Sequence, residues 1–234
     1  MKIDVKGPIV GNDEKWIYDF FGMDATSPKS VLEGIEGASG NDIEININSG
    51  GGSVFAGSEI YTALKEYEGD VTVKIVGLAA SAASVIAMAG DKVLMSPTAQ
   101  IMIHNAHVRA QGDYRDMDRT SGILKNVNQT IANAYKMRSN LSDEQLKDMM
   151  DEETWLTPQQ AQEHGFIDEV MFEQVEIAAS AGFTQMLPPE VIQKVRNELL
   201  NKQPDQEEEK PSNDSAIFMA KLNLLKLRKD VEDE

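Results

Sequence analysis

The feature that most constrains the fold of this chain is the alternation of short Val- and Ile-rich stretches with helical patterns over residues 1–200. Apolar and polar side chains alternate at residues 43–47, as in a half-buried strand, and a glycine-rich turn follows at residues 48–53. Residues 71–76 repeat the pattern of a strand. Strands that alternate with helices build a sheet with helices packed against it. We therefore predict an α/β core.

Three helical patterns support this interpretation. Residues 54–67 follow a helical period, with Ser53 placed to cap the helix. Residues 78–90 are almost all small or apolar, so we expect a helix that is buried on most sides. Residues 113–138 form a long amphipathic pattern, which should project from the core or line a partner. We expect further elements as strands at 93–95 and 101–104 and as capped helices that begin near Ser142 and Thr157, the second ending at Gly165.

The composition changes near residue 200, where we place the end of the domain. Residues 201–215 are polar, charged and proline-containing, as expected of a linker. Residues 216–234 carry apolar side chains at helical spacing beside lysines and arginines, which predicts a short amphipathic tail. This tail is either a docking peptide or a solvated end.

Charge and composition exclude several classes of function. The 22 basic and 39 acidic residues give a net charge of −17, which repels phosphate backbones and anionic lipid surfaces, so we expect no nucleic-acid partner. No apolar run of about 18 residues and no apolar leader is present, so we expect no membrane span, no secretory signal and a cytoplasmic location. The chain has no cysteine, which excludes disulfides, thiolate metal sites and a cysteine nucleophile.

Ser81 and His104 are the first candidates for chemistry. Ser81 lies between a predicted strand and a buried helix, where backbone N–H groups and the helix dipole favour developing negative charge. His104 ends a predicted strand and is one of three histidines, with His107 the rival base and His164 near a helix end. Each residue alone also fits a capping or packing role. The glycines at 48–53 could shape a turn, cradle a phosphate or offer N–H groups to an oxyanion, although the loop lacks the Lys-Ser/Thr end of a P-loop.

Together these segments resemble the ClpP family of serine peptidases over roughly residues 1–175. The resemblance is carried by four motifs in one order, at residues 47–57, 77–84, 102–105 and 155–168. The opening Gly7-Pro8-Ile9 and the segment at 16–21 are most similar to the phage-encoded ClpP-like head maturation, or prohead, proteases. The resemblance implies a ClpP/crotonase-like spiral β-α superhelix with the 113–138 helix as a projecting handle.

The resemblance also implies a Ser-His-acid site with no cofactor and no metal. The nucleophile falls on Ser81 and the general base on His104, two positions sooner than in typical bacterial ClpP. The oxyanion donors fall on the backbone N–H groups of Gly51 and Ala82. Acyl transfer would then proceed by attack of Ser81 on a peptide carbonyl and release of the acyl-enzyme by water.

The third member of the triad departs from the family pattern. The family has an aspartate two residues before the aromatic that precedes Leu-Ser/Thr, and here the matching residue is Glu153 before Trp155. A glutamate can orient an imidazole, and the adjacent Asp151 and Glu152 are alternatives. Asp168 matches a structural aspartate of the family.

The resemblance further implies stacked rings, of heptameric type, that enclose a chamber. The leading hypothesis is a serine endopeptidase of phage head maturation with capsid or scaffold proteins as substrates. Its alternative is a bacterial ATP-dependent Clp protease proteolytic subunit, which takes substrates from a Clp ATPase. A third hypothesis is a catalytically inactive assembly factor of the same fold. Acyl-CoA enzymes of the same architecture lack a serine nucleophile, so Ser81 and His104 in register disfavour that class.

Overall fold

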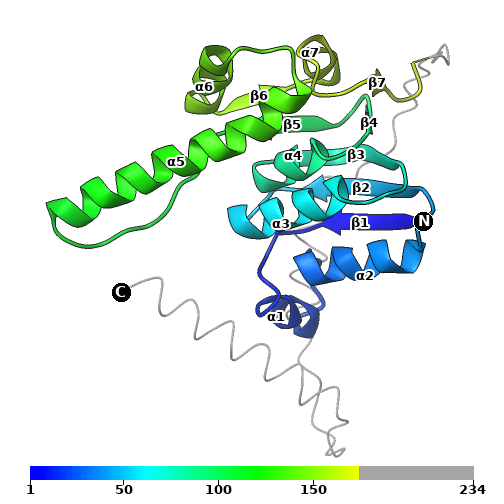
Figure 1. Ribbon diagram of the computed structural model, residues 1–234, viewed down its shortest axis with the longest axis horizontal. Coiled ribbons are helices and arrows are strands. Elements are labelled where there is room, and N and C mark those ends of the chain that lie inside the picture. The colour runs from blue at the N-terminus through cyan, green and yellow to red at the C-terminus, as the bar shows by residue number, and fades with distance from the viewer. Residues whose placement is uncertain (174–234) are drawn as a thin grey trace, which may run out of the picture. The chain divides into compact units, whose positions relative to one another are not determined.

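The structure is a computed structural model that describes residues 1–173, which form a seven-stranded sheet packed with helices (Figure 1). This architecture confirms the α/β class. The strands are β1 (Lys2–Lys6), β2 (Ile43–Ser49), β3 (Val71–Ala80), β4 (Lys92–Met95), β5 (Gln100–Ile103), β6 (Thr154–Leu156) and β7 (Glu169–Val170). The helices are α1 (Lys15–Phe20), α2 (Pro28–Ala38), α3 (Val54–Lys65), α4 (Ala82–Ala87), α5 (Tyr114–Arg138), α6 (Asp143–Asp151) and α7 (Pro158–Glu163).

The sheet is parallel except at its β5–β6 edge. Its main path runs β1-β2-β3-β4-β7, while β5 pairs with β3 and β6 pairs antiparallel with β5. Strand β3 changes partner along its length: Thr72–Ile75 pair with β4, and Leu78–Ala80 pair with β5. The carboxyl ends of β3 and β5 therefore lie side by side.

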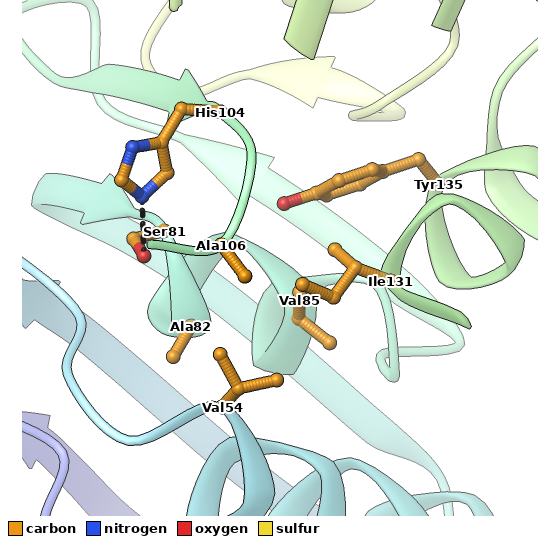
Figure 2. A pocket seen from close by; sticks show the side chains of 8 residues that line it. All are labelled: Val54, Ser81, Ala82, Val85, His104, Ala106, Ile131 and Tyr135. Carbon is orange, nitrogen blue, oxygen red and sulfur yellow. Dashed lines mark hydrogen bonds between the residues drawn. The ribbon is translucent and has the colours of Figure 1, made fainter. Parts of the chain in front are cut away.

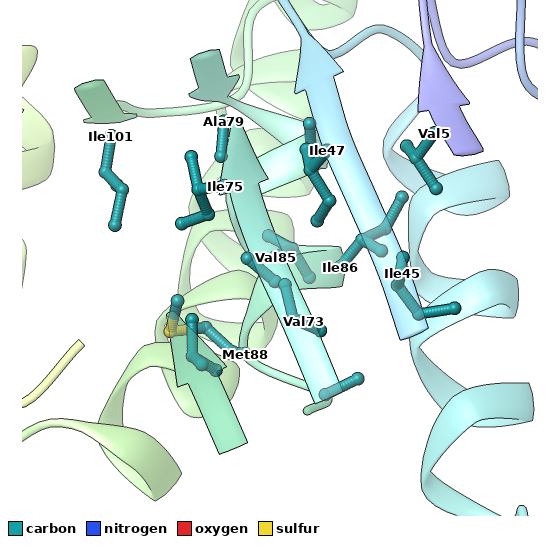
Figure 3. Close-up of a cluster of buried hydrophobic side chains, with 14 of the residues drawn as sticks. Val5, Ile45, Ile47, Val73, Ile75, Ala79, Val85, Ile86, Met88 and Ile101 are labelled. Carbon is teal, nitrogen blue, oxygen red and sulfur yellow. The ribbon is translucent and has the colours of Figure 1, made fainter. Parts of the chain in front are cut away.

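Alternating side chains of the central strands form the core beneath the helices. Val73 and Ile75 of β3 and Ile45 and Ile47 of β2 are fully buried, and they pack against side chains of α4 such as Ile86 (Figure 3). Every second side chain of these strands is buried, which is the alternation of apolar and polar residues that predicted them.

The Ala-rich segment at 77–90 differs from its prediction. We expected a strand that ended near Gly77 and a helix over 78–90, but β3 continues to Ala80 and α4 covers only Ala82–Ala87. Small residues favour helix in isolation, but here the backbone of Leu78–Ala80 is hydrogen-bonded to β5 in the sheet. Tertiary pairing overrides local propensity, and as a result Ser81 lies at the strand-helix junction itself.

Most predicted helix starts are confirmed by side-chain caps. Ser53 accepts a hydrogen bond from the Ala56 N–H at 3.3 Å, and Ser142 and Thr157 form capping boxes. Helix α5, capped by Asp113, projects beyond the sheet as expected of a handle (Figure 1). The sequence analysis did not predict α1, α2, β6 or β7.

The predicted domain end near residue 200, the linker at 201–215 and the tail at 216–234 lie outside the described residues. Among the helices that the structure describes, none combines the length and apolar character that crossing a membrane requires.

Arg138, at the end of α5, connects three parts of the fold. Its guanidinium donates to the Gly90 carbonyl at 2.9 Å and to the Asp168 carboxylate, which in turn accepts from the Val93 N–H at 2.6 Å. The Arg138 side chain is only 14% exposed. It therefore attaches the handle helix to β4 and to the segment before β7.

We expect Arg138→Ala to lower the free energy of unfolding by about 2 kcal/mol, because it removes charge-assisted hydrogen bonds and leaves their acceptors unpaired. The matched control is Arg119→Ala, since Arg119 is 72% exposed on the same helix and, in the described part of the chain, pairs only with Asp116. Its loss should stay below about 0.5 kcal/mol. Urea unfolding of both variants measures the difference, and equal losses would contradict this structural role.

Candidate active site

Ser81 occupies a strained turn between β3 and α4. Its φ of 54° and ψ of −125° are rare for a residue other than glycine. Such a conformation costs about 1–3 kcal/mol and persists only where neighbouring contacts hold it. The Ser81 N–H donates to the Met102 carbonyl at 2.9 Å, which fixes the turn against β5. The serine hydroxyl makes no capping hydrogen bond to the helix that it precedes.

His104 follows the last residue of β5 and contacts Ser81 directly. Its Nε2 lies 2.8 Å from the Ser81 Oγ (Figure 2). With the ring proton on Nδ1, the Ser81 hydroxyl donates to Nε2, which is the arrangement of a nucleophile and its general base. The two residues meet because Ala80 of β3 pairs with Met102 of β5. The sheet register therefore brings together the two residues that the sequence analysis singled out.

The surroundings of His104 favour its neutral form. Burial lowers the pKa of His104, the neighbouring His107 lowers it further, and the charge of Glu153 acts in the opposite direction. The ring centroids of His104 and His107 are 5.5 Å apart in an edge-to-face contact. A neutral imidazole can accept a proton, so His104 is suited to general-base chemistry at neutral pH.

Glu153 lies across the sheet edge from His104. In the antiparallel register, Ile103 faces Thr154, so the next pair along the two strands is His104 and Glu153. Glu153 has a φ of 52° and directs its carboxylate to the indole N–H of Trp155 at 3.4 Å. Within residues 1–173 no hydrogen bond joins the His104 ring to an acidic side chain. Glu153 therefore reaches His104 through its charge.

The two alternative acids are placed differently. Asp151 accepts hydrogen bonds from Lys147 Nζ at 2.6 Å and from Asn105 Nδ2 at 2.7 Å. These contacts, the first from Lys147, hold the pKa of Asp151 below its ordinary value. Glu152 is the exposed C-terminal cap of α6. Among the described residues, Glu153 is the one of these three acids whose charge raises the pKa of His104.

In the glycine loop, the N–H group of Gly51 is hydrogen-bonded, whereas that of Gly52 has no acceptor among the described residues. The Gly51 N–H donates to the Ser49 Oγ at 3.1 Å, which argues against the predicted role of Gly51 as an oxyanion donor. The N–H groups of Gly52 and Ala82 have no acceptor among the described residues. The Gly51 carbonyl accepts from Ile9 at 2.8 Å, and because a trans peptide directs its N–H opposite to its C=O, the Gly52 N–H points away from Ile9.

The sequence analysis did not single out Gly52, because spacing alone cannot choose among three consecutive glycines. The structure distinguishes Gly52 from the other two glycines by the parallel β-bridge that it forms with Ile9. Its φ is 150°, and a Cβ there would lie 2.2 Å from the Ile9 carbonyl oxygen. Only glycine fits this position, which holds the loop against Ile9, while the neighbouring Gly51 brings the loop close to Ser81, where a Cβ would lie 2.7 Å from the Ser81 Cβ.

An apolar pocket opens beside Ser81 and His104. Figure 2 shows its lining, which comes from α3, α4, α5 and the segment after β5. The lining residues are Val54, Ser81, Ala82, Val85, His104, Ala106, Ile131 and Tyr135. The cavity is about 10 Å³, room for about one water molecule, and its walls beside the serine hydroxyl are apolar. In the described part of the chain, no cluster of three or more His, Asp or Glu side chains could hold a metal ion.

Two further predicted residues lie apart from this site. His164 caps the end of α7, as the sequence analysis expected, and its carbonyl accepts from the Asn140 N–H at 3.0 Å. Asp168 belongs to the network of Arg138 described above. Neither residue lines the pocket.

Comparison with known proteins identifies relatives of the part of the chain that carries Ser81 and His104. The family model described as Clp protease matches residues 31–174. Proteins named ATP-dependent Clp protease proteolytic subunit are similar to this chain in Bacteroides fragilis (37% identity, 56% of this chain and 65% of the relative), Bacteroides thetaiotaomicron (35%, 56% and 61%) and Deinococcus radiodurans (31%, 56% and 65%). The match thus spans less than two thirds of the length of these curated relatives.

Proposed function

Since the chain belongs to the Clp protease family, we propose that it is a serine endopeptidase in which Ser81 is the nucleophile and His104 the general base. The observation that carries this proposal is the 2.8 Å contact between the Ser81 Oγ and the His104 Nε2 at a strained strand-helix junction. A strained serine whose hydroxyl donates to a half-buried neutral imidazole is the arrangement that acyl transfer requires.

In the proposed reaction, His104 takes the Ser81 proton as the Oγ attacks the carbonyl carbon of a peptide bond. The tetrahedral intermediate collapses when His104 returns that proton to the leaving amine, and the acyl-enzyme remains. Water, activated by His104, then attacks the ester and releases the second product. Glu153 stabilises the imidazolium that forms in each half of the reaction.

We assign the oxyanion site to the N–H groups of Gly52 and Ala82. Both lack an acceptor within residues 1–173, and the Gly51 N–H is engaged by Ser49. A free, preorganised N–H group is the donor that stabilises developing charge, because no existing hydrogen bond has to be broken. Gly52 replaces Gly51 in this proposal.

Val85 and Ile131 give the cavity beside the Ser81 hydroxyl apolar walls (Figure 2). These walls support a substrate with an apolar side chain on the residue that donates the scissile carbonyl, and its binding requires the cavity to widen. A peptide with a charged residue at that position would leave the charge unpaired.

The names of the relatives favour the Clp proteolytic-subunit hypothesis over phage head maturation. All three relatives named above are called proteolytic subunits of an ATP-dependent Clp protease, whereas none is called a head maturation protease. We therefore propose a ring-forming subunit that receives protein substrates from a Clp ATPase in the cytoplasm. Capsid or scaffold proteins as substrates stay a prediction from the sequence.

Labelling with a fluorophosphonate tests the proposed activity. The full chain, with its oligomeric state recorded, should gain one adduct by intact mass, and peptide mapping should locate it on Ser81. An assembled chain that gains no adduct would contradict the peptidase proposal and favour the inactive assembly factor.

The rate of this labelling should depend on pH through His104. Only the neutral imidazole accepts the serine proton, so the rate falls as pH falls through the pKa of His104. Burial and His107 lower that pKa, so the apparent pKa should lie below the ordinary value of about 6.5. Rates measured from pH 5 to 8 give the apparent pKa.

His107→Gln is the matched variant for the pH profile. It removes the electrostatic effect by which His107 lowers the pKa of His104, so the apparent pKa should shift upward. An apparent pKa above the ordinary histidine value in the unmodified chain would contradict this account of the base.

A further inference from the structure

A buried chain of hydroxyl groups connects the handle helix to the backbone of Ser81. The Ser84 Oγ donates to the Ser81 carbonyl oxygen at 2.6 Å, and the Tyr135 hydroxyl lies 2.8 Å from the same Ser84 Oγ. Ser84 is completely buried and Tyr135 is 1% exposed. The mechanism proposed above uses neither hydroxyl.

The direction of the protons in this chain is determined by its end. A carbonyl oxygen can only accept, so the single hydroxyl proton of Ser84 points to Ser81. The Tyr135 hydroxyl must therefore donate to Ser84. Consecutive hydrogen bonds of this kind polarise one another in a buried environment. The chain runs from Tyr135 through Ser84 to the Ser81 carbonyl, with each donor oriented toward the nucleophile.

The Ser81 carbonyl shares its peptide group with the Ala82 N–H. The group is planar and its resonance couples the two ends, so a hydrogen bond donated to the carbonyl makes the N–H a stronger donor and fixes its direction. The same carbonyl also accepts from the N–H groups of Ser84 at 2.9 Å and Val85 at 3.3 Å. Several donors thus hold one peptide group that follows a residue with a strained φ of 54°.

We propose that Ser84 and Tyr135 are positioning residues, which hold and polarise the 81–82 peptide group so that the Ala82 N–H stabilises the oxyanion. This inference rests on the proposed serine peptidase function and adds to it a role for the handle helix α5. Tyr135 also lines the pocket from the side of α5, with its hydroxyl directed toward Ser81 and His104 (Figure 2).

The test uses Tyr135→Phe, Ser84→Ala and the double variant in the full chain. The first two changes each remove one hydroxyl of the chain, and the phenylalanine keeps the ring that packs edge-to-face on Phe166 with centroids 5.9 Å apart. Tyr61→Phe is the matched control, because it removes a hydroxyl whose one hydrogen-bond partner among the described residues is the Met137 sulfur at 3.8 Å. Urea unfolding of every variant establishes that the chain is folded.

We expect kcat for an apolar fluorogenic peptide to fall about ten-fold in each single variant with KM unchanged. The inhibition constant of a peptide boronate, whose tetrahedral adduct occupies the oxyanion site, should rise by the same factor. The double variant should lose no more than the larger single loss, because the two hydroxyls act in one chain. Tyr61→Phe should behave as the unmodified chain.

Three results would overturn the inference while leaving the proposed function intact. They are unchanged kcat in Tyr135→Phe, a boronate constant that does not follow kcat, and additive losses in the double variant, which indicate general structural damage. An unmodified chain that takes no fluorophosphonate adduct would instead contradict the proposed function, and this inference with it.

Discussion

Replacing Ser81 with alanine should lower peptide hydrolysis by about 10⁶-fold, the loss that removal of a triad nucleophile produces. The alanine keeps the backbone contacts of the turn, because the Ser81 N–H and carbonyl make them. Within residues 1–173, the one hydrogen-bonding contact of the serine Oγ is with His104. The fold should therefore persist while the activity disappears.

Hydrolysis of a fluorogenic peptide and the mass of the fluorophosphonate-treated chain measure this effect together. The matched control is Ser58→Ala on α3, outside the pocket, which should retain both the adduct and the activity. A Ser81→Ala chain that still hydrolyses peptides at the original rate would exclude Ser81 as the nucleophile.

Glu153→Gln should lower kcat by about ten-fold, because the neutral amide cannot stabilise the His104 imidazolium through its charge. The loss should be smaller than for a buried triad acid, since Glu153 is exposed and acts on His104 through its charge. Steady-state hydrolysis gives kcat, and KM should change little.

The neighbouring acids provide the comparison. Glu152→Gln should leave kcat close to its original value, because Glu152 is exposed at the end of α6. Asp151→Asn keeps the size of the side chain but loses the ion pair with Lys147. A larger loss of kcat in Asp151→Asn than in Glu153→Gln would move the role of the acid to Asp151.

Part of the sheet could be predicted because its side chains alternate with a period of two. That pattern identified β2 and the first part of β3, short apolar stretches indicated β4 and β5, and glycines and caps marked several of the boundaries. The resemblance of four short motifs then brought Ser81 and His104 into one hypothesis, and the structure places their side chains in contact.

Other features depend on partners that a linear pattern does not contain. The small residues of Leu78–Ala80 fit a helix locally, and only pairing with β5 makes them a strand. Gly51 and Gly52 are equivalent by composition, but the Gly51 N–H donates to Ser49 while the Gly52 N–H has no acceptor within residues 1–173. The hydroxyl chain joins Ser84 to Tyr135, 51 residues later, and neither residue carried a signal of that contact.

The partner change within β3 also determines which length changes the chain can tolerate. Ser81 and His104 follow strands that are in register, so the residues between β4 and β5, from Ser96 to Ala99, do not set the distance between them. Insertions or deletions there lengthen or shorten a connection and leave the pair aligned. One residue added within β5 itself would turn the imidazole to the opposite face of the sheet. Related chains can therefore differ in the length of the β4–β5 connection while the serine hydroxyl and the histidine ring stay within hydrogen-bonding distance.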